Sequence, residues 1–444
     1  MTALLGDRVA LAVRAATPRI TGRITSVVGL VVDVEGVDAA VGDVVLLGTR
    51  TGLDGVPAEV VGVERGRARC MPLGPLTGLR AGDRVAGGGD GLRVRVGADL
   101  LGRVLDGLGR PTDGGAPLVG ENVPVDNDPP HALARQRVNQ PLTLGVRALD
   151  CLVTAGRGQR VGIFAGSGVG KSSLLSMIAR GTSASVSVLA LVGERGREVR
   201  EFLENDLGAE GLARSVVVVA TSDAPPVVRL RAAFVATRVA EWFRDQGQDV
   251  LLMMDSLTRV AMAQREIGLS SGEPPTTRGY PPSTFALLPR LLERAGPAER
   301  GTITGIYTVL VEGDDHNEPI ADAARSILDG HITLDRRLAT SGHFPSIDVL
   351  ESVSRVVGAV TTPEQRAQAS VLRRVLAAHR DARELIEVGA YAPGSNSDVD
   401  AAVALWPAVD AFLRQPLDEV LGADEAWDQL AALAKALVQA GARP

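Results

Sequence analysis

The stretch that decides the fold reads Arg160-Val-Gly-Ile-Phe-Ala-Gly-Ser-Gly-Val-Gly-Lys-Ser-Ser173. It begins with a short apolar run typical of a buried strand, continues through a glycine-rich turn, and leads into a helical pattern over residues 174–180. Glycines allow the backbone to wrap so that successive amides point at one cluster of oxygens, and the helix N-terminus adds partial positive charge. The stretch therefore predicts a loop that binds the phosphates of a nucleoside triphosphate.

Individual residues of this loop have predicted roles. Lys171 would reach the terminal phosphates, and the Ser172 hydroxyl would be a magnesium ligand. The strict pattern has glycine at its first position, where this chain has Ala165; that position shapes the turn more than it contacts phosphate. A glycine-rich turn with an incidental lysine is the alternative, but strand, loop and helix follow in the required order. The predicted nucleotide-binding residues are Ala165, Gly166, Ser167, Gly168, Val169, Gly170, Lys171, Ser172 and Ser173.

The composition supports a special role for Lys171. Of the 47 basic residues, only Lys171 and Lys435 are lysines. A compact ammonium group fits between phosphate oxygens better than a planar guanidinium does, so lysine is retained where arginine would be a poor substitute.

Two acidic residues follow apolar strand-like runs elsewhere in the chain. Asp255 ends residues 250–255 and is the candidate magnesium-side carboxylate, although it could instead cap the next helix together with Ser256 or Thr258. Glu194 ends another run and is the candidate for polarising the attacking water, with a solvated loop charge as the alternative. Strand ends on the carboxyl edge of a parallel sheet converge on one crevice, so Lys171, Glu194 and Asp255 are expected to meet.

The wider pattern predicts three regions. Short β segments broken by glycine extend from about residue 20 to residue 96, where Gly42-Asp-Val-Val45 is echoed by Gly82-Asp-Arg-Val85, and suggest a small barrel or sandwich. A linker rich in Gly, Pro and Asp spans 106–130. Strand-like runs then alternate with helical stretches, which calls for a mainly parallel sheet covered by helices on both faces. From residue 362 the spacing is helical, with Pro393, Pro407 and Pro416 as breaks. The predicted strands of the alternating region are 160–164, 187–192, 215–220, 250–255 and 301–310.

The bulk properties narrow the class of protein. With 444 residues and a net charge of −6, the chain has room for several domains but lacks the basic excess of a protein that grips nucleic acid backbones. Aromatic residues are only 3%, which leaves few platforms for stacking bases. Cys70 and Cys151 fit neither a disulfide framework nor metal-ligand spacing. The sequence shows neither a secretory signal nor an apolar run of membrane-spanning length, which predicts a cytoplasmic location.

Before the β-rich region, the N-terminal residues show one further pattern. Several apolar side chains there could share a helix face, interpreted as a packed or frayed terminus in preference to a partner-docking helix. These side chains, with one arginine between them, are Leu4, Leu5, Arg8, Val9, Ala12 and Val13.

Several segments resemble the type III protein-export ATPases, and specifically the flagellar kind. The resemblance covers residues from about 20 to about 440 and is tightest over 140–360. The family is similar in turn to the catalytic subunits of rotary ATP synthases, which implies an α/β fold: a RecA-like P-loop NTPase core over 96–361, an N-terminal β-barrel over 1–95 and a C-terminal helical domain over 362–444. The segments that carry the resemblance are 165–173, 192–200, 255–259, 263–266, 272–282, 327–331 and 343–348.

The resemblance assigns roles to particular residues. Lys171 and Ser172 match the phosphate and magnesium contacts, Asp255 the magnesium aspartate and Glu194 the catalytic glutamate. Phe344 matches an aromatic residue that stacks on adenine, where the residue alone would suggest an ordinary core phenylalanine. The resemblance further implies that Arg355 is an arginine finger reaching a neighbour's nucleotide, and that Arg195 approaches the terminal phosphate.

Because loop, glutamate and finger occur in one chain, each subunit can be both donor and acceptor of a shared site. The sequence therefore predicts a head-to-tail homo-oligomeric ring, a hexamer, that hydrolyses ATP with magnesium. A rotary synthase subunit and a nucleic-acid translocase are the competing functions. Segment 272–282, with its four prolines, resembles the export enzymes rather than synthase subunits, and the acidic, aromatic-poor composition argues against a nucleic-acid translocase.

Within the export group, residues 311–315 and 318–322 look flagellar, whereas virulence-type enzymes more often have serine and asparagine there. The resemblance implies a dimeric regulator, a central stalk-like coiled-coil protein, export chaperones and a membrane export gate as partners. It also implies peripheral association with the export apparatus at the inner membrane, and no nucleic acid partner is expected.

Overall fold

The computed structural model describes residues 21–49, 55–87, 89–311 and 318–443. The possible helix face between Leu4 and Val13 lies outside these residues. The described chain forms two compact units. One contains the residues up to Arg93 together with Pro124–Asp126 and Glu266–Pro274, and the other contains the remainder. The predicted boundaries at 95/96 and 361/362 remain predictions.

The first unit is built on a closed six-stranded barrel. Strands follow one another around it in the order β1-β2-β5-β4-β3-β6, with antiparallel neighbours. Alternate residues point inward and form an apolar core that includes Val32, Val34, Val45 and Leu47. Of the two architectures that the sequence left open, the barrel is the one observed. Its strands are β1 (Thr21–Val28), β2 (Val31–Glu35), β3 (Val44–Leu47), β4 (Val56–Glu64), β5 (Arg67–Pro72) and β6 (Arg84–Ala86).

The repeated Gly-Asp pattern marks two equivalent turns of this barrel. Gly42 and Gly82 have φ angles of 97° and 92°, a left-handed conformation that glycine adopts without steric cost. In each turn the aspartate carboxylate accepts a hydrogen bond of 2.8 Å from the backbone three residues earlier, at Asp43 and at Asp83. The strands that follow, β3 and β6, pair with each other. The predicted turn-then-strand echo is confirmed.

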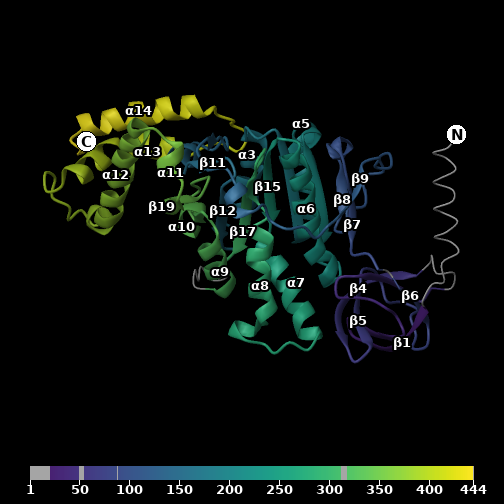
Figure 1. Ribbon diagram of the computed structural model, residues 1–444. Coiled ribbons are helices and arrows are strands. Elements are labelled where there is room, and N and C mark those ends of the chain that lie inside the picture. The colour runs from purple at the N-terminus through teal and green to yellow at the C-terminus, as the bar shows by residue number, and fades with distance from the viewer. Residues whose placement is uncertain (1–20, 50–54, 88, 312–317, 444) are drawn as a thin grey trace, which may run out of the picture. The chain divides into compact units, whose positions relative to one another are not determined.

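The second unit contains a nine-stranded, mostly parallel sheet (Figure 1). All five strands predicted for the alternating region are present. Four were missed: β8, β16, β18 and β19, of which β16 is antiparallel to β17 and β19 is antiparallel to β18. In spatial order the main path is β19 (Ile347–Ser354), β18 (Gly330–Leu334), β12 (Arg160–Ala165), β17 (Thr302–Leu310), β15 (Asp249–Asp255), β13 (Val186–Glu194), β14 (Ser215–Thr221) and β8 (Val104–Asp106), with β16 (Gly296–Pro297) beside β17.

The central strands are buried on both faces, as in sheets covered by two layers of helices. On one face, Leu189 and Leu191 of β13 and Leu251 and Met253 of β15 join a large apolar core. Helix α6 packs on β13, β14 and β15 but contributes no residue to that core, so it covers the opposite face. The helices of this layered region are α2 (Arg147–Leu152), α3 (Lys171–Gly181), α4 (Gly196–Glu201), α5 (Gly208–Ala213), α6 (Pro226–Asp245), α7 (Leu257–Ser270), α8 (Pro282–Leu292), α9 (Pro319–Ile327), α10 (Arg336–Thr340) and α11 (Val357–Val360).

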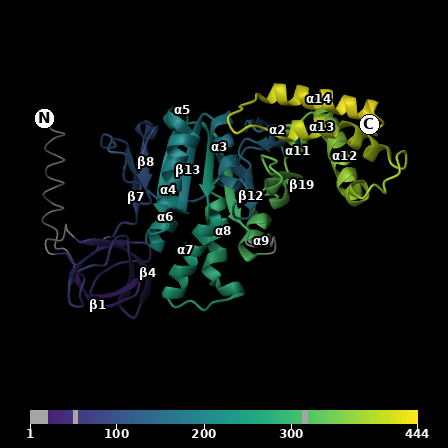
Figure 2. The ribbon, with the colours of Figure 1, turned by 180° about the vertical axis from the view of Figure 1, so that it is seen from behind.

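Three helices at the end of the chain pack against one another and against α2 (Figure 2). They are α12 (Pro363–Glu387), α13 (Ser397–Leu413) and α14 (Ala423–Gln439). Helix α12 begins with a capping box in which Thr362 and Gln365 exchange hydrogen bonds. Pro393 and Pro416 separate helices as predicted. The prediction that Pro407 breaks a helix was wrong: it lies inside α13, because Val409 and Phe412 beyond it are buried in the core and hold the helix together.

The predicted linker at 106–130 is more ordered than its composition suggests. It begins at the last residue of β8, which pairs with β14, and it contains β9 (Glu121–Pro124), which pairs with β7 (Arg93–Val96). The Asp113 carboxylate binds the Arg103 guanidinium at 2.7 Å and accepts a hydrogen bond from the Val104 amide. Its aspartates thus serve as local hydrogen-bond acceptors.

Among the described helices, none is long and apolar enough to cross a membrane.

The remaining short elements connect the layers. They are η1 (Ala98–Leu100), η2 (Ala132–Ala134), β10 (Pro141–Leu142), β11 (Ala155–Gly156), the π-helical segment η3 (Phe202–Leu207) and η4 (Thr277–Gly279). Both cysteines are buried and free, and burial raises the pKa of the Cys70 thiol to about 12.

Candidate nucleotide-binding site

The glycine-rich loop joins the end of β12 to the start of α3. Gly168 and Gly170 have φ angles of 75° and 94°, so the backbone passes twice through a conformation that few other residues adopt. Alternation of this kind forms a concave surface of backbone amides suited to an anion. Ala165 is the last residue of β12 and has no positive φ angle, so alanine fits this position without strain.

Lys171 lies between two carboxylates. Its Nζ forms an ion pair with Asp255 Oδ1 and lies 3.6 Å from Glu194 Oε1. All three side chains are largely buried, with exposures of 13% for Lys171, 9% for Asp255 and 13% for Glu194. The structure therefore brings together the three residues that the strand-end argument placed in one crevice.

Strand order explains this convergence. Strands β12, β17, β15 and β13 are successive neighbours in the parallel part of the sheet. The phosphate loop follows β12, Asp255 ends β15, and Glu194 ends β13. Their carboxyl ends share one edge, where ligands of open α/β sheets bind.

The Asp255 carboxylate faces the loop. Its Oδ1 accepts a hydrogen bond from the Thr308 hydroxyl at 2.7 Å as well as the contact from Lys171. Near the start of α7, it is the Ser256 hydroxyl that accepts a hydrogen bond from the Arg259 amide. Of the two interpretations of Asp255, the geometry favours the carboxylate of a site over the helix cap.

Glu194 lies in a mixed electrostatic environment. Burial raises its pKa; Lys171 and Arg259 oppose that effect, and Asp255 adds to it, with a net upward shift. Arg259 Nε lies 4.0 Å from the Glu194 carboxylate. A carboxylate with a raised pKa beside a cation is suited to orienting water and exchanging a proton.

A pocket of about 1010 Å³ opens on this edge of the sheet. Residues of the phosphate loop line one side, with Glu194 and Arg195 beside them. Arg195 is 75% exposed and pairs with Glu198, so its guanidinium lies at the rim of the pocket. The other lining residues had no predicted role, although several lie in segments 255–259, 263–266 and 272–282, which carry the family resemblance. The most notable are Arg259, Arg265, Arg278, Tyr280 and Arg336.

Two of these unassigned residues have contacts that explain their presence. The Arg336 guanidinium donates a 3.1 Å hydrogen bond to the Ser167 carbonyl and so braces the phosphate loop. Arg265 stacks over the Tyr280 ring at 5.2 Å. Neither contact has a local sequence signal, since each joins residues more than ten positions apart.

Phe344 lies against the phosphate loop. Its ring is the nearest neighbour that a Cβ on Gly170 would meet, at 3.2 Å, and its side chain is 45% exposed. The adjacent Ser346 hydroxyl bonds to the Val169 carbonyl. An exposed aromatic ring beside a phosphate loop is available for stacking, which an ordinary core phenylalanine would not be.

Arg355 lies far from its own phosphate loop. It follows β19, and its backbone amide donates to the Asp329 carbonyl at 3.0 Å, next to Gln159. Gln159 precedes β12, whereas the loop follows β12; six strand residues separate them by about 20 Å. The structure thus brings together all the predicted site residues except Arg355.

The fold and this strand-end site define a P-loop nucleotide-binding ATPase with a barrel and a helical end region. Residues 145–354 match the nucleotide-binding domain of the ATP synthase alpha/beta family, 24–89 match the beta-barrel domain of that family, and 361–432 match the type III secretion EscN ATPase C-terminal domain.

Comparison with whole proteins indicates the same family. The chain is 51% identical over 401 residues to the flagellum-specific ATP synthase of Bacillus subtilis, covering 90% of this chain and 91% of the relative. It is 52% identical over 400 residues to a type 3 secretion system ATPase of Xanthomonas euvesicatoria, with 90% of each chain covered.

The solved structure of the assembled ATPase EscN from the enteropathogenic E. coli type III secretion system superposes with a TM-score of 0.88 at 44% identity, over 93% of this chain and 100% of EscN. The chain belongs to the flagellar and type III secretion ATPases of the ATP synthase alpha/beta family. The predicted fold and the predicted export-ATPase class are confirmed. Flagellar and virulence-type relatives are near-equally similar.

Proposed function

We propose that this chain hydrolyses magnesium ATP at a site shared between neighbouring copies of itself, and that the hydrolysis powers export of flagellar proteins. The observation that carries the shared site is the position of Arg355. It lies at the amino end of β12, about 20 Å from the phosphate loop at the carboxyl end, beyond the reach of one arginine side chain.

The phosphate loop supplies binding. Backbone amides around Gly168 and Gly170 and the Lys171 ammonium group would hold the phosphates, while Phe344 would stack on adenine. In the structure Lys171 forms ion pairs with both Asp255 and Glu194. Phosphate oxygens would compete for Lys171, which would leave both carboxylates available for their roles in the reaction.

The donor set fits magnesium. The described residues contain no group of three His, Cys, Asp or Glu side chains that could hold a metal. A site with one carboxylate and one hydroxyl, here Asp255 and Ser172, is what Mg²⁺ uses when substrate phosphates complete its coordination. When bound, the ion neutralises charge that develops on the transferred phosphoryl group.

Glu194 would orient the attacking water and accept its proton, since its carboxylate is buried and its pKa is raised. Arg195 at the pocket rim would approach the terminal phosphate. Arg355 from the neighbouring copy would complete the site and stabilise the charge of the transition state, an effect of about 10³- to 10⁵-fold for arginine fingers.

One chain that has both halves of a site closes naturally into a head-to-tail ring, for which we propose a hexamer. EscN, its relative, has been solved assembled and also in complex with its central stalk EscO. By that resemblance we propose a stalk protein, a dimeric regulator, export chaperones and a membrane gate as partners, at the cytoplasmic face of the inner membrane. The flagellar assignment rests on residues 311–315 and 318–322, most of the first segment lying outside the described residues.

The shared site is tested by measuring ATPase activity per chain against protein concentration at saturating magnesium ATP. We expect activity to rise steeply with concentration. Arg355→Ala should abolish this rise and leave nucleotide binding by the dilute protein intact. Arg65→Ala, which removes a 92% exposed arginine of the barrel, is the control.

Mixing two inactive variants sharpens the test. Arg355→Ala retains Glu194, and Glu194→Gln retains Arg355, so mixed assemblies contain some interfaces with both residues intact. Recovery of activity on mixing supports the shared site, whereas an inactive mixture that still co-assembles shows that the two residues do not act at one interface.

A further inference from the structure

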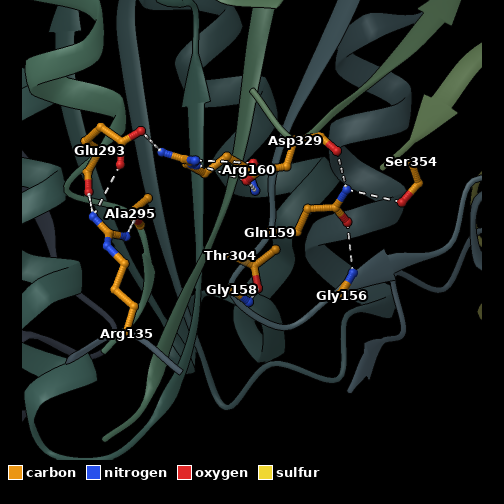
Figure 3. A network of polar contacts seen from close by, with 10 residues as sticks. All are labelled: Arg135, Gly156, Gly158, Gln159, Arg160, Glu293, Ala295, Thr304, Asp329 and Ser354. Atoms are coloured by element: carbon orange, nitrogen blue, oxygen red, sulfur yellow. Dashed lines mark hydrogen bonds and ion pairs between the residues drawn. The ribbon is translucent and has the colours of Figure 1, made fainter. Parts of the chain in front are cut away.

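The amino end of β12 contains a polar network with no assigned role (Figure 3). At its centre is Gln159, whose side chain is fully buried. Its Oε1 accepts a hydrogen bond from the Gly156 amide at 2.9 Å, and its Nε2 donates to the Asp329 carbonyl at 2.9 Å and to the Ser354 hydroxyl at 3.2 Å. A buried primary amide with partners on both atoms fixes the segments that it joins.

Two of these segments hold Arg355. Ser354 precedes it directly, and the Asp329 carbonyl that accepts from Gln159 also accepts from the Arg355 amide at 3.0 Å. The Ser354 hydroxyl donates in turn to the Thr154 carbonyl at 2.8 Å. The backbone of Arg355 is therefore fixed on both sides, while its side chain is exposed, with one guanidinium contact to the Arg325 carbonyl at 3.3 Å.

Asp329 is itself held in place by Arg160. The Arg160 backbone amide and its Nε both donate to Asp329 Oδ2, at 3.1 and 3.0 Å, and Nη2 donates to Oδ1 at 3.2 Å. Arg160 also pairs with Glu293, which in turn contacts Arg135 (Figure 3). Bidentate pairs of this kind are geometrically restrictive, so the Asp329 carbonyl has little freedom to shift.

From these contacts we infer that Gln159, supported by Arg160 and Asp329, is a positioning residue that sets Arg355 for insertion into the neighbouring subunit's nucleotide site. This inference rests on the shared site proposed above. An exposed arginine can adopt many orientations, and a fixed backbone restricts which of them reach a neighbour. A displacement of about 1 Å at a catalytic group costs roughly 10²-fold in rate.

The test uses Gln159→Met in the full-length chain, which keeps side-chain length and removes all three hydrogen bonds. At a concentration where wild-type chains assemble, we expect ATPase activity to fall about 10- to 100-fold, with assembly and nucleotide binding retained. Gln136→Met is the matched control, because Gln136 is exposed and, among the described residues, its side chain bonds to the Glu299 carbonyl alone.

Three readouts separate positioning of Arg355 from a general structural role. First, adding Arg355→Ala to Gln159→Met should cause no loss beyond that of Arg355→Ala alone, because both act through one guanidinium. Second, mixing Gln159→Met with Glu194→Gln should restore activity, since the second variant supplies a well-positioned arginine to the first. Third, Ser354→Ala, which leaves no large cavity, should show a smaller loss of ATPase activity. This variant replaces Gln159→Met in the test if Gln159→Met fails to fold.

The outcomes are distinguishable. Wild-type activity in both Gln159→Met and Ser354→Ala would overturn the inference. The inference would also be overturned if mixing with Glu194→Gln restored the activity of Arg355→Ala but not that of Gln159→Met. If Arg355→Ala itself is not rescued, the shared site fails first.

Discussion

The two ends of strand β12 carry polar clusters of opposite character. At the carboxyl end, Lys171 is shared by two carboxylates of which one, Glu194, has a raised pKa. At the amino end, both polar atoms of the Gln159 amide have partners, and Arg160 binds Asp329 through three hydrogen bonds. In the first cluster, a bound phosphate could replace the carboxylates as partners of Lys171. In the second, both polar atoms of the Gln159 amide already have protein partners.

This difference indicates a division of work along one strand. A site that must bind, react and release requires groups whose partners can change, and such groups cost stability. A cluster that positions a residue for use by a neighbouring subunit requires groups whose partners do not change. Substitutions at the carboxyl end should therefore affect activity more than stability, and substitutions at the amino end should affect stability as well.

At the carboxyl end, the largest effect is expected for Glu194→Gln. Turnover should fall about 10²- to 10⁴-fold because the proposed water-activating group is lost, while ATP binding remains. The melting temperature should not fall, since the raised pKa shows that the surroundings disfavour the ionised carboxylate that glutamine replaces. A large drop in melting temperature would contradict the proposed contrast between the two ends.

Phe344→Ala should weaken ATP binding by about 5- to 150-fold, the equivalent of roughly 1–3 kcal/mol for one base stacked on an aromatic ring. Binding of inorganic tripolyphosphate, which has no base, is the control and should be unchanged. Equal weakening of both ligands would show that Phe344 supports the loop through Gly170 instead of stacking on adenine.

At the amino end, Gly330→Ala should destabilise the fold by about 1–3 kcal/mol, as overpacking typically does. A Cβ at this position would lie 2.6 Å from the Val353 carbonyl oxygen and 3.1 Å from Gln159 Nε2. Denaturant unfolding measures the loss, and Gly358→Ala is the matched control because a Cβ there meets nothing within 4 Å. Equal unfolding midpoints for the two variants would contradict the tight packing of this end.

The smallest effect concerns pH. The acid limb of kcat/KM reports the free enzyme, in which burial raises the pKa of Glu194. In the proposed mechanism the carboxylate form of Glu194 is the active one, so acidification should reduce kcat/KM at pH values above the ordinary glutamate pKa of about 4.3. Circular dichroism over the same range checks that the fold persists. A limb at or below the ordinary value would argue against Glu194 as the water-activating group.

Much of the carboxyl end could be predicted because its signals are local. The glycine spacing before Lys171 and the apolar runs that end in Glu194 and Asp255 are each visible within a short window, and parallel-sheet geometry brings them together. No short sequence pattern distinguishes Arg355 from the many other arginines, so only the resemblance to a family indicated its role.

The amino end could not be predicted in this way. Two of the three side-chain hydrogen bonds of Gln159 reach residues 329 and 354, and such distant hydrogen bonds leave no periodic pattern. Strands β18 and β19 were missed for a related reason, since their burial depends on neighbours far away in the chain. Pro407 shows the opposite error, where a strong local signal for a break was overridden by the packing of α13.

The near absence of lysine gives Lys171 an experimental use. Apart from the α-amino group, an amine-selective reagent can modify only Lys171 and Lys435. Lys435 is exposed on α14, whereas the Lys171 side chain is 13% exposed between two carboxylates. The ratio of covalent labelling at these two positions, read by mass spectrometry of the unaltered protein, is therefore an internally referenced gauge of occupancy at a single phosphate loop.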